Sequence, residues 1–72
     1  MTTITIQTKL NTAAEANMLG EGITSALDGA RVIGTPDVPG NVRVQIEVPD
    51  EHEAYVLGLL DADDRVFAYR CA

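Results

Sequence analysis

The chain of 72 residues contains no tryptophan, one phenylalanine and two tyrosines. Its core must therefore be built from Val, Ile, Leu and Ala, so we expect modest stability, near the lower size at which one core supports folding. With one cysteine, Cys71, no disulfide can form within the chain, which is typical of a reducing compartment. We expect residues 1–72 to form a single compact domain.

Long apolar runs are also missing. No stretch approaches the roughly 18 apolar residues that a membrane span needs, and residues 1–7 lack the basic and apolar regions of a signal peptide. We therefore expect a cytoplasmic protein without a membrane partner.

Hydrophobic patterns of two periods follow one another along the chain. Alternation typical of strands covers residues 2–10, 41–48 and 65–71, and residues 30–38 form a further strand that Pro36 restricts to a sheet edge. Helical spacing covers residues 12–27 and 50–60. This order predicts an α+β fold, a ferredoxin-like β-α-β-β-α-β sandwich with a four-stranded antiparallel sheet and two helices on one face.

Local signals mark the ends of these elements. Thr12 with Glu15, and Asp50 with Glu53, have the spacing of helix N-terminal capping boxes. Pro39-Gly40 suits the turn between the two middle strands. Gly20 lies on the inward stripe of the first helix, where it would allow close approach to the sheet, whereas Gly22 has no such reason.

Charge is unevenly distributed in a chain whose net charge is −6. The five basic residues lie in predicted strands or at their ends: Lys9, Arg31, Arg43, Arg65 and Arg70. Nine of the eleven acidic residues lie on the predicted helices or at their ends: Glu15, Glu21, Asp28, Asp50, Glu51, Glu53, Asp61, Asp63 and Asp64. We therefore expect a negative helix layer and a neutral to weakly positive sheet. Acidic residues also suit helix starts and solvent, so this polarity has a purely structural interpretation as well.

The second helix carries a candidate binding anchor. Tyr55 projects roughly opposite the buried stripe of Val56, Leu57 and Leu60, and Leu59 follows one turn later. An aromatic residue and a leucine among carboxylates resemble an anchor with an electrostatic rim. The candidate partner-binding residues are Glu51, Tyr55, Leu59, Asp61, Asp63 and Asp64, although a single surface tyrosine is often incidental.

Groups that carry catalysis are missing from the sequence. There is no Ser-His-Asp set, no glycine-rich phosphate loop and one histidine, His52, so we expect no catalytic residues and no enzyme activity. Asp61, Asp63 and Asp64 lack the central Gly and terminal Glu of a calcium loop, and His52 and Cys71 lack companions at zinc-ligand spacing. We therefore expect no metal site and no cofactor.

Direct nucleic-acid binding is also not expected. The net charge of −6 opposes contact with phosphates, and the central strands lack the aromatic residues on which RNA bases stack. Phe67 and Tyr69 share one face of an edge strand, where they complete the core or cover a dimer contact. We favour the core.

The element order resembles that of ferredoxin-like families such as acylphosphatases, heavy-metal carriers and ACT domains. A phosphate-cradling loop with an arginine and a Cys-x-x-Cys pair would mark the first two, and neither is present. ACT domains favour glycine at the first strand–helix junction, where this chain has Leu10-Asn11-Thr12. No residue role is carried over from these families.

Two functions remain open at this point. The leading one is a small acidic module or inhibitor that docks its helix face on a basic protein surface, including that of a nucleic-acid-binding protein. In size and charge it resembles small acidic phage proteins such as anti-CRISPR inhibitors. The alternative is a dimeric regulatory or assembly module of ACT-like type that senses a small ligand and pairs through its strand edges.

Overall fold

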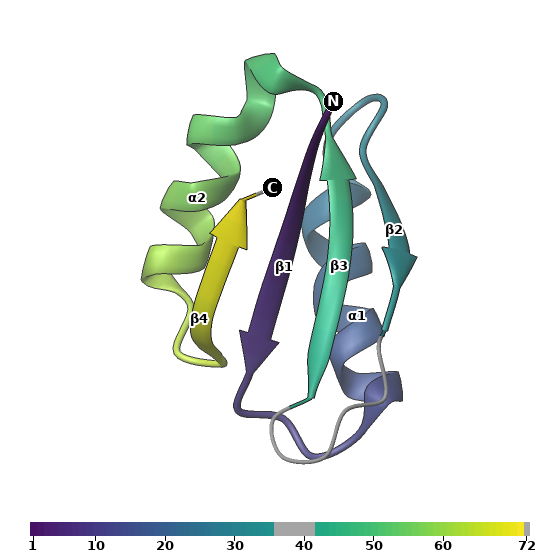
Figure 1. The fold of residues 1–72 in the computed structure, drawn as a ribbon, viewed down its shortest axis with the longest axis vertical. Helices are drawn as coiled ribbons and strands as arrows, with labels where there is room; N and C mark the ends of the chain where they lie inside the picture. The colour runs from purple at the N-terminus through teal and green to yellow at the C-terminus, as the bar shows by residue number, and fades with distance from the viewer. Residues whose placement is uncertain (36–41, 72) are drawn as a thin grey trace.

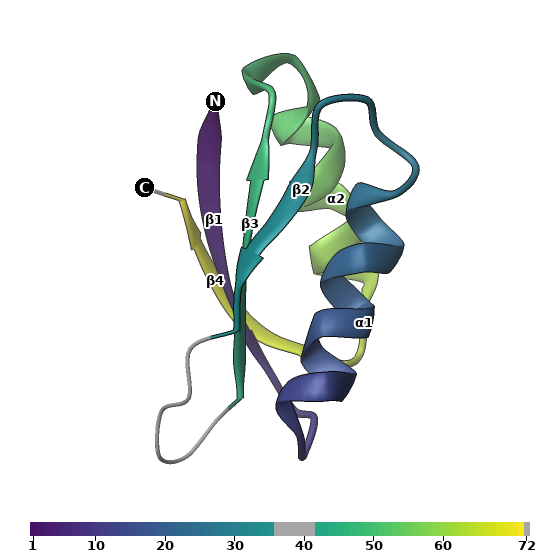
Figure 2. The same ribbon diagram turned by 90° about the vertical axis from the view of Figure 1, so that its right-hand side faces the viewer.

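In a computed structural model that describes residues 1–35 and 42–71, two helices lie on one face of a four-stranded antiparallel sheet (Figures 1 and 2). The strands are β1 (Thr2–Thr8), β2 (Arg31–Gly34), β3 (Arg43–Val48) and β4 (Val66–Cys71), in the order β2-β3-β1-β4. The helices are α1 (Ala13–Thr24) and α2 (Glu53–Ala62), and a short 3-10 turn, Asp50–His52, precedes α2. The predicted fold class is confirmed, and the strand order is consistent with a ferredoxin-like arrangement.

The core lies between the sheet and the helix layer. The central strands β1 and β3 alternate in burial along their whole length, as their sequence predicts, because every second side chain faces the helices. Ile4 pairs with Ile46 and Ile6 with Val44 across these strands. The buried apolar residues are Ile4, Ile6, Ala16, Leu19, Ile23, Val44, Ile46, Val48, Val56 and Leu60.

Gly20 allows α1 to lie close to the sheet. A Cβ atom at this position would lie 2.9 Å from Cγ2 of Val44 and 3.0 Å from Cγ2 of Val32. Around Gly22 there is no such neighbour within 4 Å. The predicted difference between the two glycines is therefore confirmed, and only Gly20 is required by packing.

Helix α1 begins as predicted and ends earlier than predicted. Thr12 is the N-cap, and its hydroxyl accepts a hydrogen bond from the backbone N–H of Glu15 at 3.2 Å. The helix ends at Thr24 instead of residue 27, and the Leu27 N–H bonds back to the Thr24 carbonyl in a turn. The chain then needs Gly29, at φ +82°, to turn toward β2.

The edge strand β4 carries a β-bulge. Gln7 pairs with Ala68 and Thr8 with Val66, so Phe67 has no partner residue on β1. Phe67 is 61% exposed, whereas Tyr69 packs against the core. The prediction of a core position is correct for Tyr69 and wrong for Phe67, because the bulge breaks the alternation that would have placed both on one face.

Two predictions concern a segment outside the described residues. Pro36 and the Pro39-Gly40 turn both fall in residues 36–41, and strand β2 is described only as far as Gly34. In the rest of the chain, neither α1 nor α2 has the length and hydrophobicity of a membrane-spanning helix.

Candidate protein-binding surface

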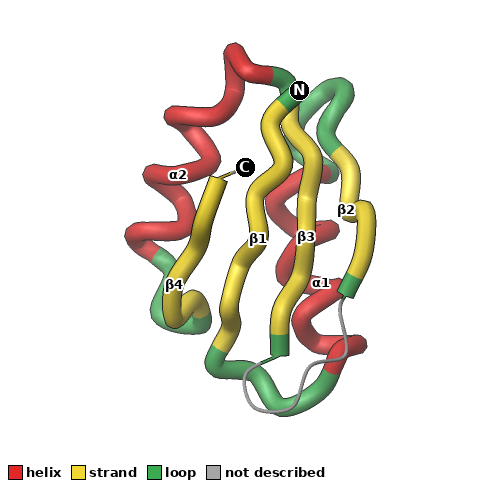
Figure 3. Tube along the Cα trace, viewed as in Figure 1, coloured by secondary structure: helices red, strands yellow, loops and turns green. Residues whose placement is uncertain are grey.

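The two layers of the fold carry different charges. The helix layer, red in Figure 3, and the turns at its ends carry most of the acidic side chains, including Glu15, Glu21, Glu51 and Asp61. The opposite side of the sheet is hereafter called the outer sheet face. Among the described residues it carries three arginines and one carboxylate, Glu47. It presents Thr3, Thr5, Gln7, Arg31, Arg43, Gln45, Glu47, Ala68 and Arg70.

An apolar pair lies in the middle of the acidic surface along α2. Tyr55 is 57% exposed and Leu59, one turn further on, is 37% exposed. Glu51 lies in the 3-10 turn before the helix and is exposed. We call the six predicted residues the α2 acidic face: Glu51, Tyr55, Leu59, Asp61, Asp63 and Asp64. It has carboxylates at both ends and an apolar centre.

Asp63 is held within the protein by Arg65. Its carboxylate accepts from Arg65 Nη2 at 2.7 Å and from Arg65 Nε at 3.0 Å, and it also accepts from the Arg65 backbone N–H at 2.9 Å. The hydrogen bonds from the Arg65 side chain lower the pKa of Asp63, against the opposing effect of burial. The charge of Asp63 is thus compensated, and its role is to shape the turn between α2 and β4.

Replacing Asp63 with Asn is expected to destabilise the fold by about 1 kcal/mol, because the turn loses charge-assisted hydrogen bonds to Arg65. The folded-state pKa is depressed, so this stabilisation is present above the ordinary value of 3.8 and is lost as the pH falls through the lower folded-state value. Urea unfolding at pH 7 and at about pH 3 measures both effects. Asp64→Asn at the neighbouring position is the control, and an equal loss in both variants would contradict this role.

Asp61 lies at the boundary between α2 and β4. Its Oδ1 accepts a hydrogen bond from the Tyr69 hydroxyl at 2.8 Å, which raises the pKa of Tyr69. The bond links the last turn of the helix to the edge strand. Asp61 remains exposed, so its carboxylate can still face a partner.

The acidic residues at the C-terminal end of α2 interact unfavourably with the helix dipole. The C-terminal end of a helix carries partial negative charge, and an acid there costs about 0.3–1 kcal/mol. Asp61, Asp63 and Asp64 all lie at this end, and the last turn of α2 contains no basic residue. Arg65 compensates Asp63, whereas Asp64 makes no hydrogen bond or ion pair with the part of the chain that the structure describes.

The start of α2 is built differently from the prediction. No side chain caps the 3-10 turn or α2, because Asp50 accepts a hydrogen bond from the Thr2 hydroxyl at 2.7 Å. Glu53 also lies 3.2 Å from this hydroxyl. The hydrogen bond from Thr2 lowers the pKa of Asp50, followed by the effect of the Met1 amino group. The predicted Asp50–Glu53 capping box is therefore wrong. Asp50 instead ties the 3-10 turn to β1, and Glu53 lies beside the same hydroxyl.

Sequence reasoning missed the partners of these acids. Thr2, Arg65 and Tyr69 each bind a carboxylate at an end of α2. Only the Asp63–Arg65 contact has a signal in the sequence, namely the short spacing of an acid and a base two residues apart. The other contacts depend on β1 and β4 lying beside α2, which is a tertiary property.

The described residues form no metal-ligand cluster at this surface. In residues 1–35 and 42–71, no three His, Cys, Asp or Glu side chains form a group that could hold a metal ion. Comparison with protein-family models, with curated proteins and with solved structures finds no match for this chain. The function of the surface must therefore be inferred from its geometry and charge.

Proposed function

We propose that the α2 acidic face binds a basic surface of another protein. Tyr55 and Leu59 are the apolar anchors, and Glu51, Asp61 and Asp64 form the electrostatic rim. Asp63 positions the turn that carries Asp64. Aromatic anchors enclosed by charged groups are typical of the residues that dominate binding energy at interfaces.

The placement of acids at the C-terminal end of α2 carries this proposal. Acids at a helix start have a structural explanation, but acids at a helix end oppose the helix dipole. Arg65 compensates Asp63 and Tyr69 binds Asp61, whereas Asp64 opposes the dipole with no compensating contact among the described residues. A residue that costs stability in this way is expected at a functional site. The negative end of α2 also adds its field to that of the carboxylates, which strengthens attraction to a basic partner.

The partner class that fits best is a nucleic-acid-binding protein. Its binding groove is basic and shaped for an anionic rod, and the α2 acidic face has carboxylates at both ends of the helix with an apolar centre between them. In this version of the proposal the protein is an inhibitor that occupies the groove in place of phosphates, as an anti-CRISPR protein would. The net charge of −6 supports fast, salt-sensitive association with such a surface.

Tyr55→Ala is expected to weaken binding about 30-fold or more, because truncation of an aromatic anchor typically costs at least about 2 kcal/mol. The measurement is an NMR titration of the ¹⁵N-labelled protein with a short Arg- and Lys-rich peptide that contains one Leu. Saturable shifts are expected at the amides of α2. The affinity for the peptide should fall as salt is raised from about 50 to about 500 mM, because added salt shortens the Debye length and screens the attraction between the charges.

Met18→Ala is the matched control, because Met18 is 70% exposed on α1 in the same helix layer. It should leave the peptide affinity unchanged. Equal loss in both variants, or shifts of the same size around Glu15 and Glu21, would reject the α2 acidic face as the binding surface.

The inhibitor version has its own test. The wild-type, Met18→Ala and Tyr55→Ala proteins are immobilised and used in parallel to capture proteins from a lysate at low salt. A nucleic-acid-binding protein retained by the first two, lost with Tyr55→Ala and displaced by a nucleic-acid fragment supports it. A captured partner that nucleic acid does not displace argues for simple docking instead.

The exposed aromatic ring on edge strand β4 supports a second candidate, the dimeric assembly module. Phe67 is 61% exposed at the bulge, where it could contact a second copy. The same bulge disrupts the hydrogen-bond ladder that edge-to-edge pairing requires, so the acidic docking module is preferred. Sedimentation at micromolar concentration separates the two candidates, since the assembly module requires a dimer.

A further inference from the structure

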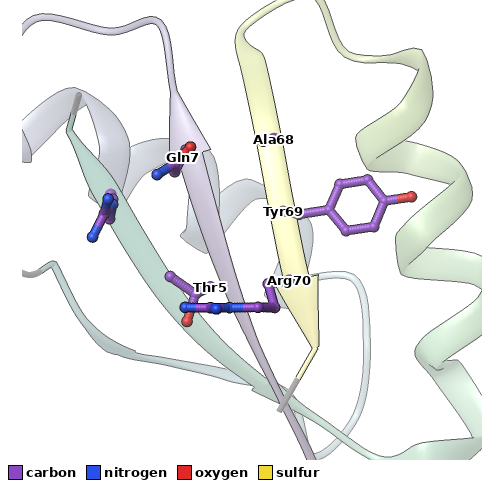
Figure 4. Close-up of a pocket in the computed structure, with 6 residues that line it drawn as sticks. Thr5, Gln7, Ala68, Tyr69 and Arg70 are labelled. Carbon is purple, nitrogen blue, oxygen red and sulfur yellow. The ribbon is translucent and has the colours of Figure 1, made fainter.

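The outer sheet face contains a shallow depression of about 280 Å³ (Figure 4). It lies over β3, β1 and β4, on the side of the sheet away from the α2 acidic face. Its lining residues are Thr5, Gln7, Arg43, Ala68, Tyr69 and Arg70.

Two arginines converge on this depression from different strands. Arg43 on β3 is the register partner of Gln7, and Arg70 on β4 is the register partner of Thr5. The Arg70 side chain reaches from β4 across β1 beside Thr5 (Figure 4). The two guanidinium groups therefore flank the same stretch of the central strand.

In the part of the chain that the structure describes, neither guanidinium is neutralised by a neighbouring acid. Glu47, the one described carboxylate on this face, is bound by Arg31 at 3.2 Å. Within residues 1–35 and 42–71, no carboxylate lies within ion-pair distance of Arg43 or Arg70. The charges of these two arginines therefore have no acidic partner among the described residues and are available to a ligand in the depression.

The polar side chains between the arginines are arranged as donors. With its oxygen turned toward Arg43, the Gln7 amide accepts from Arg43 Nη2 at 2.8 Å and from Arg43 Nε at 3.1 Å. The amide NH₂ group of Gln7 is then left to donate elsewhere. The Thr5 hydroxyl accepts from Gln45 Nε2 at 3.2 Å, so its own hydrogen is available. These contacts also hold Arg43 and Thr5 in place before any ligand arrives.

The remaining lining residues add no negative charge. Ala68 contributes a methyl group, and the Tyr69 ring points away from the depression toward α2 (Figure 4), where its hydroxyl binds Asp61. The depression thus combines two positive charges, an amide donor and a hydroxyl donor. Guanidinium groups match the planar or tetrahedral oxygens of carboxylates and phosphates.

We propose that this depression binds a small organic oxyanion, a phosphate monoester or a dicarboxylate, between Arg43 and Arg70. Its size is near the lower limit of about 300 Å³ for small-molecule sites, which suits a ligand of metabolite size. Binding here is independent of the α2 acidic face, so each proposal can fail without the other.

NMR titrations at constant ionic strength test the proposal with two probes, inorganic phosphate and succinate. Saturable shifts are expected at the Arg43 and Arg70 Nε–H signals and at the backbone amides of Thr5 and Gln7, with α2 unshifted. Saturation by either probe supports the site, and the tighter probe identifies phosphate or carboxylate as the preferred group. The shifts should saturate once the probe concentration is about tenfold above a Kd of about 1 mM. Shifts that still rise linearly at a probe concentration of about 10 mM would overturn the proposal.

Arg31 provides the matched control, because it lies on the same face with its charge already paired to Glu47. Arg43→Gln and Arg70→Gln are each expected to raise the Kd about tenfold or more, the effect of losing a hydrogen bond from a charged group. Arg31→Gln should change it less than about twofold, the effect of a distant screened charge. Equal effects in all three variants would mean nonspecific attraction and would overturn the assignment.

Two further measurements identify a different occupant. A single-stranded oligonucleotide that saturates the Arg43 and Arg70 signals more tightly than either small probe would make this a nucleic-acid surface. Shifts of the same signals on raising the protein concentration without ligand would assign the surface to a second copy of the chain. Either result would overturn the small-oxyanion proposal.

Discussion

Ile46→Ala is expected to destabilise the protein by about 2–5 kcal/mol, the usual cost of truncating a fully buried Ile. Ile46 is 0% exposed on the central strand β3, where it pairs with Ile4 on one side and Val32 on the other. With about 0.05–0.15 kcal/mol per residue, a chain of this length has a total stability of about 4–11 kcal/mol. The loss is therefore a large fraction of the total, and urea unfolding followed by circular dichroism measures it.

Two variants keep this prediction testable even where Ile46→Ala does not fold. Ile46→Val removes one methylene group and should cost about 0.5–1.5 kcal/mol. Ile33→Ala, on edge strand β2 at 41% exposure, should stay within about 0.5 kcal/mol of the wild type. A similar loss at Ile33 and Ile46 would mean that the core does not lie between the sheet and the helices.

Gly20→Ala is expected to destabilise the fold by up to about 2 kcal/mol although alanine is the better helix former. The added methyl group would lie 2.9 Å from Val44 Cγ2 and 3.0 Å from Val32 Cγ2. Both contact atoms belong to β-branched side chains with little rotamer freedom, so the helix must move away from the sheet. The cost of that overpacking exceeds the gain of about 1 kcal/mol in helix propensity.

Gly22→Ala in the same helix is the matched control and should stabilise the protein by about 1 kcal/mol. Nothing lies within 4 Å of a Cβ atom at this position, so only the propensity gain remains. Opposite signs for the two substitutions, measured by urea unfolding, are the expected result. Two stabilised variants would show that α1 does not approach β2 and β3 as closely as the structure indicates.

The two proposed binding surfaces lie on opposite sides of the sheet. The α2 acidic face belongs to the helix layer, whereas Arg43 and Arg70 belong to the outer sheet face (Figure 2). This separation has a physical advantage, because the carboxylates of the helix layer cannot easily neutralise the arginines on the other face.

Much of the fold follows from local pattern. The alternation of Val44, Ile46 and Val48 predicts the buried face of β3, and Thr12 predicts the start of α1. The start of α2 was mispredicted because the Asp50 carboxylate accepts a hydrogen bond from the Thr2 hydroxyl on β1 and does not cap its own helix. A capping box is a local motif, and a neighbour 48 residues away in sequence overrides it.

The candidate site was only partly predictable. The spacing of Tyr55 and Leu59 places both on the exposed side of α2, and their exposure agrees with this. From the sequence alone, Asp61, Asp63 and Asp64 have equivalent predicted roles. The structure separates them, since Asp63 is held by Arg65, Asp61 binds Tyr69, and Asp64 extends into solvent.

Hydrophobic periodicity by itself determined which elements form, their order and the buried faces of the central strands and of the helices, because apolar side chains are driven out of water. Only the tertiary structure decided which strands are neighbours, and with them the bulge at Phe67, the partners of the helix-end acids and the shared depression of Arg43 and Arg70. The physical reason is the sequence separation over which each signal acts. Periodicity is a property of a few consecutive residues, whereas these contacts join residues that chain folding alone brings within hydrogen-bonding or Coulombic distance.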